Sequence, residues 1–239
     1  MKGKIEQFGI GDHTVTVYCP PNFAEDRLPV LYLNESHASD WDSWLPSLER
    51  SMIKEQCQKA YLVVIEPTKW GRDFSPWEAK GLHEGDVPFE GQADARIRLL
   101  TEVVKPEIDK KFPTLPDPAN TGIFGYSLGG LAAIYAPFIS PAFGRIGALS
   151  ASLWYEGFME FLQTHEFLSP ARVYLSLGSK EEKTRHPLMC HIGECYRETE
   201  AILSARLGKE NVQFDLHNGG HATEVDRRIL MGLLWLLRA

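Results

Sequence analysis

The sequence has no long apolar run, no excess of basic residues and no paired-cysteine motif. No apolar stretch in its 239 residues is long enough to cross a bilayer, so we expect no membrane partner. The first eight residues lack the apolar segment of a signal peptide, and we therefore expect a cytoplasmic location. With 25 basic and 32 acidic residues, the net charge is -7, which argues against nucleic acid as a partner.

Cofactor-binding and metal-binding signatures are also missing. No G-x-G-x-x-G follows a first strand and no G-x-x-x-x-G-K-[ST] is present, which disfavours a dehydrogenase or a kinase. A metal cluster of His186, Cys190, His191 and Cys195 is the alternative, but no second pair stands at zinc-site spacing. Without an export signal, these two cysteines and the other two, Cys19 and Cys57, should be reduced thiols. We expect no cofactor and no metal.

Apolar strand patterns alternate with helical patterns along the chain. The expected strands cover 13–18, 28–34, 61–67, the run before residue 125, 145–152, 172–178 and 212–217. Expected helices include one through 44–53, capped by Ser39 or Asp40, and one through 97–108 that Pro106 interrupts. Further helices should follow residue 127 and lie within 187–207 and 223–237. This order predicts a mostly parallel sheet with helices on both faces, as one α/β domain over 1–239 without a separate lid domain.

Residues 121–133 predict a sharp turn between a strand and a helix. They contain G-x-S-x-G, in which Gly125 and Gly129 flank Ser127. In this context the serine hydroxyl is lifted clear of the backbone and becomes a candidate nucleophile. The N–H of Leu128, at the start of the helix, is then one oxyanion donor. We choose the backbone N–H of Glu35, in the loop after an early strand, as the second donor, although the usual His-Gly or Asp-Gly is absent there.

A serine nucleophile needs a base and an acid, and this fold class places both near the last strand. His221 follows the strand at 212–217 directly and is the predicted base, whereas His217 lies on that strand and should be a packed residue. The predicted acid is Glu181, ahead of its neighbour Glu182, with Asp215 a more distant alternative. The serine, acid and base therefore occur in the required chain order.

A long connection, residues 68–91, is rich in glycine, proline and tryptophan, and connections of this length are often functional. Arg72 could bind a carboxylate or phenolate, while Trp77 and Trp154 could stack on an aromatic ring or a sugar. The competing interpretation is that Arg72 forms a structural ion pair with the next residue and that the tryptophans are packing. His37, in the loop after an early strand, is a further candidate for substrate contact.

Several segments match one known family in order across nearly the whole chain. They are 28–33, 72–77, 104–112, 125–130, 148–152, 178–181 and 220–221. On these segments the sequence resembles the putative esterase family of α/β-hydrolases, which includes S-formylglutathione hydrolases, enterochelin-type siderophore esterases and feruloyl esterases. The resemblance implies an α/β-hydrolase fold and a serine esterase acting on a small-molecule ester, with Ser127 as nucleophile, Glu181 as acid and His221 as base. An acyltransferase with an alcohol acceptor, or a non-catalytic binding protein on the same fold, is the alternative. Neither the natural ester nor an oligomeric state follows from the sequence.

Overall fold

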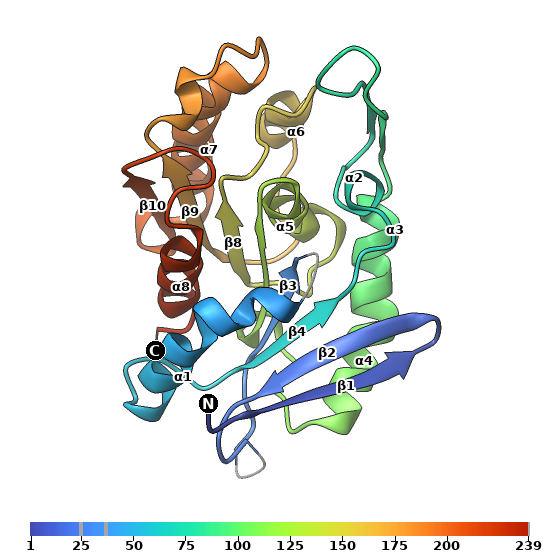
Figure 1. Ribbon diagram of the computed structural model, residues 1–239, viewed down its shortest axis with the longest axis vertical. Coiled ribbons are helices and arrows are strands. Elements are labelled where there is room, and N and C mark those ends of the chain that lie inside the picture. Colours follow the sequence, from blue (N-terminus) through green and yellow to red (C-terminus); the bar gives the residue numbers. More distant parts are fainter. Residues whose placement is uncertain (24–25, 36–37, 239) are drawn as a thin grey trace.

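A twisted eight-stranded sheet forms the centre of the computed structural model, which describes residues 1–23, 26–35 and 38–238 (Figure 1). In chain order its strands are β1 (Lys4–Ile10), β2 (His13–Cys19), β3 (Val30–Asn34), β4 (Tyr61–Ile65), β7 (Thr121–Tyr126), β8 (Arg145–Leu149), β9 (Arg172–Gly178) and β10 (Val212–His217). Their order across the sheet is β1-β2-β4-β3-β7-β8-β9-β10. The pairs β1–β2 and β2–β4 are antiparallel and all the others are parallel, so the predicted mostly parallel sheet is confirmed.

The central strands are apolar because both of their faces are covered. Every residue of β3, β4 and β8 is buried, as expected for parallel strands between two helical layers. Leu33 pairs with Val64 on one side and with Phe124 on the other, which aligns the ends of β3, β4 and β7. Loops that follow these strands therefore meet at one edge of the sheet.

Helices cover both faces, as the alternating pattern predicts. They are α1 (Leu45–Ile53), α2 (Trp70–Asp73), α3 (Ala93–Arg98), α4 (Lys105–Lys111), α5 (Leu128–Ile139), α6 (Phe158–Thr164), α7 (Ile192–Leu207) and α8 (Val225–Leu236). Shorter 3-10 segments are η1 (Ala38–Ser43), η3 (Pro118–Asn120), η4 (Glu181–Lys183), η5 (Met189–His191) and η6 (Lys209–Asn211). Leu48 of α1 and Leu233 of α8 belong to the core on one face, whereas α3 to α7 pack on the other. Within the described ranges no separate lid domain lies over the sheet.

Two helix boundaries show the effect of proline. A π-helical segment, η2 (Leu99–Val104), joins α3 to α4, and Pro106 lies in the first turn of α4. Because proline has no N–H, the predicted interruption occurs there and is confirmed. The predicted cap of α1 by Ser39 or Asp40 is wrong, since that helix starts at Leu45 with Trp44 as N-cap. Pro46 fits only the first helical turn and so fixes this later start.

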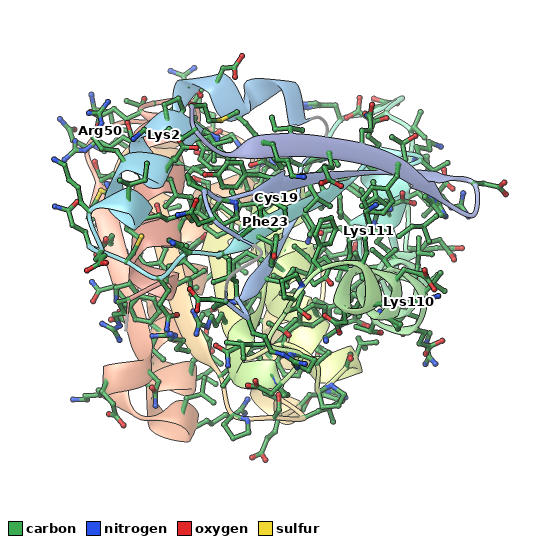
Figure 2. The ribbon with its side chains drawn as sticks, turned by 90° about the horizontal axis from the view of Figure 1, so that it is seen from below. Lys2, Cys19, Phe23, Arg50, Lys110 and Lys111 are labelled. Carbon is green, nitrogen blue, oxygen red and sulfur yellow. The ribbon has the colours of Figure 1, made fainter. Side chains whose placement is uncertain are left out.

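The strand β1 and the helix α6 are elements that the sequence patterns do not predict. β1 forms an antiparallel hairpin with β2, and its start is held by Glu49, whose carboxylate accepts hydrogen bonds of 2.6 Å from the backbone N–H groups of Lys2 and Gly3. Figure 2 shows this hairpin from below, with Lys111 of α4 beside it. The Lys111 ammonium lies 4.5 Å from the ring centroid of Phe8 on β1. Long-range contacts of this kind give β1 its place at the edge of the sheet.

The connection over residues 68–91 has structure of its own. It contains α2 and a small antiparallel pair, β5 (Glu78–Ala79) and β6 (Phe89–Glu90). The indole N–H of Trp77 donates to the carbonyl of Glu156 at 2.8 Å, which ties the connection to the segment before α6. None of the helices in the described part of the chain combines the length and apolarity that a membrane span requires.

Candidate active site

The strand–turn–helix expected around Ser127 is present. Ser127 joins β7 to α5 with φ 56° and ψ -124°, a conformation that is rare and costly for a residue with a side chain. Backbone hydrogen bonds hold it there: its N–H donates to Leu149 at 2.9 Å and its carbonyl accepts from Ser152 at 3.1 Å. The side chain caps nothing at the helix start and lines an open cleft.

Two glycines allow this turn to pack tightly. A Cβ on Gly125 would lie 2.3 Å from the carbonyl oxygen of Gly129, and one on Gly129 would lie 2.4 Å from the carbonyl oxygen of Asn34. The Asn34 side-chain amide also donates to the Gly129 carbonyl at 3.1 Å. The end of β3 is therefore pressed against the first turn of α5, which places the Asn34–Glu35 peptide beside the Ser127 turn.

His221 and Glu181 meet although 40 residues separate them. The imidazole Nδ1 lies 2.8 Å from Glu181 Oε2. Glu181 opens η4 after β9 and His221 follows β10, so both residues lie in loops at the carboxyl ends of two neighbouring parallel strands (Figure 1). The glutamate side chain is only 6% exposed, whereas that of the histidine is 48% exposed and open to the cleft.

The alternatives for acid and base lie elsewhere. Glu182 pairs with Arg197 at 3.4 Å on the surface, and Asp215 accepts a hydrogen bond from Tyr174 at 2.7 Å. His217 stays on β10 with its Nε2 buried and without a hydrogen-bond partner among the described residues. Of the candidates, the structure brings only Glu181 and His221 together.

The second oxygen of Glu181 is held by donors from three directions. Oε1 accepts hydrogen bonds from the Ser150 hydroxyl at 2.5 Å and from the Gly178 N–H at 2.7 Å, and Arg228 Nη1 lies 3.4 Å away. Burial raises the pKa of this carboxyl, but the hydrogen bonds from His221, Ser150 and Gly178 outweigh that effect and leave the pKa below its ordinary value. The group is therefore a carboxylate at neutral pH.

Sequence reasoning missed Arg228, which is fully buried. A usable signal was present: Arg228 lies four residues before Gly232 and eight before Leu236, on the buried face of an amphipathic helix. A charged residue on such a face needs a buried partner, and that requirement could have directed the search to a carboxylate.

A cleft of about 420 Å³ opens beside Ser127 and His221. Its apolar lining includes Leu82, Trp154, Met189 and Ile192. Lys180 and Lys183 also line it, so the cleft combines apolar surface with two cationic side chains. This composition suits a ligand that is largely apolar but carries negative charge.

The remaining predicted residues divide between this cleft and other places. Trp154 lines it, whereas Trp77 is held at Glu156 and packs edge-on to Tyr155, which matches the packing interpretation. Arg72 lies in a separate hollow with its Nε 4.0 Å from Glu90, and the described residues do not show the ion pair of the competing interpretation, between Arg72 and Asp73. His37 lies outside the described residues.

The predicted oxyanion donors flank the Ser127 turn. Leu128 is the first residue of α5, so its N–H has no acceptor within the helix. Glu35 follows β3 directly, next to the carbonyl that abuts Gly129. Neither residue is among those that line the cleft beside Ser127, and Glu35 lines a second hollow together with Asn34 and Tyr126.

The cysteine and histidine residues of the suggested metal cluster have other contacts. His186 Nε2 lies 2.8 Å from the carbonyl of Leu82, and Cys190 Sγ lies 3.3 Å from the carbonyl of Pro187. In the part of the chain that the structure describes, no three His, Cys, Asp or Glu side chains are grouped to hold a metal ion.

Comparison with known proteins shows the family to which the chain belongs. The family model described as "Putative esterase" matches residues 10–225. The chain belongs to this family. An uncharacterized protein from Bacillus subtilis, YbbA, is 29% identical over 197 residues, which are 80% of this chain and 78% of the relative. The siderophore enterobactin esterase of Emericella nidulans is 31% identical over 101 residues, 38% of this chain and 33% of the relative.

Solved structures show the same fold. An IroE-like serine hydrolase from Shewanella oneidensis superposes with a TM-score of 0.80 at 17% identity, covering 98% of this chain and 80% of that one. The enterobactin esterase FES from Shigella flexneri gives 0.73 at 20% identity, covering 99% and 59%. The architecture is thus the α/β-hydrolase fold that the resemblance implies, and the family assignment makes the protein a hydrolase of carboxylic esters.

Proposed function

We propose that Ser127, His221 and Glu181 form a catalytic triad that hydrolyses an ester through an acyl-enzyme. The contact of 2.8 Å between His221 Nδ1 and Glu181 Oε2, in the cleft that Ser127 also lines, carries this proposal. The carboxylate holds the imidazole in the tautomer whose Nε2 can accept a proton, and it stabilises the imidazolium that then forms.

The reaction proceeds in two acyl transfers. Ser127 Oγ bonds to the carbonyl carbon of the ester while its proton passes to His221 Nε2. The C–O bond to the alcohol then breaks, and the departing alcohol takes that proton. A water molecule attacks the acyl carbon with His221 again as base, which releases the carboxylic acid and restores the serine hydroxyl. The N–H groups of Leu128 and Glu35 stabilise the oxyanion in both steps.

For the substrate, we propose an ester whose acyl part carries an aromatic catechol, of the 2,3-dihydroxybenzoyl-serine kind, which is anionic when a phenolic hydroxyl is ionised. One relative is a siderophore enterobactin esterase, and the FES protein has been crystallised in the presence of 2,3-di-hydroxy-N-benzoyl-serine. In this chain, Trp154 offers a ring for stacking, and Lys180 and Lys183 offer positive charge beside it. The cleft therefore matches the two chemical features of such a substrate.

Covalent labelling tests the nucleophile. A fluorophosphonate probe should label the wild-type protein once, and Ser127→Ala should abolish both labelling and ester hydrolysis while the melting temperature stays close to the parent value. Ser152→Ala is the matched control, because that hydroxyl also lines the cleft. Labelling of Ser127→Ala at the parent rate would refute the assignment. Ester products formed after addition of acceptor alcohols would favour the acyltransferase alternative.

The substrate class is tested by comparing two esters. Lys180→Gln combined with Lys183→Gln should lower kcat/KM for enterobactin about tenfold or more, while the value for neutral p-nitrophenyl acetate should change little. Lys110→Gln is the control, since that lysine is exposed on α4 and does not line the cleft. Equal losses for both esters would contradict the proposed role of the lysines.

A further inference from the structure

Arg228 is a fully buried cation at the centre of a polar network beneath the active site. Its Nε donates to the Ser176 hydroxyl at 3.0 Å, its Nη2 to the Ser150 hydroxyl at 2.5 Å and its Nη1 to the Tyr126 hydroxyl at 2.8 Å. Glu181 is the one carboxylate that pairs with it among the described residues, at 3.4 Å. Burying a charged group costs desolvation free energy, and the hydrogen bonds of this network offset that cost.

Two of these partners contact the Glu181–His221 pair themselves. The Ser150 hydroxyl donates to Glu181 Oε1, which is also the oxygen nearest to Arg228. The Tyr126 hydroxyl donates to the backbone carbonyl of His221, and the two rings meet edge-on at 5.3 Å. One arm of the network thus ends on the acid and the other on the loop that carries the base.

From this arrangement we infer that Arg228 is a positioning residue for the triad. It fixes Glu181 Oε1 so that Oε2 faces His221, it places a buried cation 3.4 Å from that carboxylate, and through Tyr126 it holds the His221 loop. This inference rests on the proposed triad. The residues that position the triad then include one on α8, a helix that does not line the cleft.

The charged and titratable groups around Glu181 and Arg228 come from every element packed on them. They are His221 in the loop after β10, Tyr126 on β7, Tyr174 on β9, Tyr196 on α7, and His217 and Asp215 on β10. Burial raises the pKa values of the three tyrosines and lowers the pKa of His217, so these groups are neutral at neutral pH. Asp215 is engaged by Tyr174. Arg228 is therefore the cation that balances the charge of Glu181.

The test is the pH dependence of kcat/KM. Without this cation, the Glu181–His221 pair holds its last proton more tightly. Arg228→Met should therefore move the acidic limb of the kcat/KM profile to higher pH by about one unit. It should also lower kcat about tenfold or more at the plateau with KM little changed. Arg228→Lys keeps the charge with fewer hydrogen bonds and should return the limb to its wild-type position.

A matched control separates positioning from stability. Arg145 is also buried, but it contacts Gln58, Asn120 and two backbone carbonyls far from the triad. Both Arg145→Met and Arg228→Met should lower the melting temperature, and only Arg228→Met should move the limb. An unmoved limb in folded Arg228→Met, or an equal shift in Arg145→Met, would overturn the inference.

If Arg228→Met does not fold, Tyr126→Phe decides the matter. It removes one hydroxyl and should lower kcat several-fold at constant KM, because the His221 loop loses its anchor; an unchanged kcat would refute the role of the network. The rate of fluorophosphonate labelling should follow the same pH limb in each variant. Absence of labelling in the wild-type protein would instead refute the proposed triad, so the two failures are distinguishable.

Discussion

Gly129→Ala should disable the proposed oxyanion site while leaving the triad in place. A Cβ at this position would lie 2.4 Å from the Asn34 carbonyl oxygen, 3.2 Å from its Cβ and 3.4 Å from its carbonyl carbon. Because the nearest atom is backbone, no side-chain rotation can relieve the contact. The Asn34–Glu35 peptide must therefore move, and with it the N–H group that we propose as the second oxyanion donor.

The size of the effect follows from the displacement. The carbonyl must retreat by about 1 Å to reach an ordinary van der Waals separation, and a shift of that size is enough to misplace a catalytic group. Loss of one oxyanion donor typically lowers kcat about 100- to 1000-fold. Stability should change far less, because alanine gains about 1 kcal/mol over glycine within a helix and so offsets part of the strain.

The assay is kcat on a short aryl ester together with thermal unfolding. Gly71→Ala is the matched control, since its Cβ would meet the Phe89 ring at an ordinary 3.6 Å. It should keep the parent activity and melting temperature. If Gly129→Ala unfolds normally and retains kcat within about threefold, the Glu35 N–H is not a donor and the reasoning fails.

Three further predictions concern the acid, the N-terminal strand and the thiols. Glu181→Gln should lower kcat about 10⁴-fold, as for other triads whose acid becomes an amide, and Glu182→Gln should leave it near the parent value. Glu49→Gln should lower the free energy of unfolding by about 1–3 kcal/mol at pH 7, measured in urea. Burial raises the pKa of Glu49, but two backbone N–H groups and a tyrosine hydroxyl lower it more, so its native pKa lies below the unfolded-state pKa. The stability difference between the parent and Glu49→Gln should therefore persist above the unfolded-state pKa and vanish as pH falls through the native pKa. A stability difference that grows in acid would contradict this prediction. A thiol reagent should modify only Cys190 in the native protein, because burial raises the pKa values of the other three thiols to about 11 or 12, and Cys190→Ser should remove the reaction.

Local sequence pattern was sufficient for seven of the eight strands of the sheet and for the chain order of the candidate site residues. The ranges of β9 and β10 and the strand–turn–helix at Ser127 match the prediction, because apolar runs and flanking glycines encode them within a few residues. The family resemblance rested on the same local segments and is confirmed by the family assignment. His221 and Glu181 could then be chosen as candidates because they follow the ends of β10 and β9.

What the sequence could not decide depends on the direction of side chains and on contacts between distant segments. Glu181 and Glu182 are adjacent and chemically equivalent, yet the turn at η4 sends one to His221 and the other to Arg197. Trp154 reaches the cleft and Trp77 does not, although both are tryptophans in connections near the same edge.

The sequence by itself determined the alternating α/β architecture, the Ser127 turn and the chain order of the candidate acid and base, since short-range periodicity and steric limits at glycine carry that information. Only the tertiary structure decided which carboxylate meets the histidine, where β1 joins the sheet, and that Arg228 lies buried beneath the proposed triad. These outcomes depend on how β7, β8, β9 and α8 pack against one another, and burial of a charge is favourable only when residues far apart in the chain arrive together to offset its desolvation.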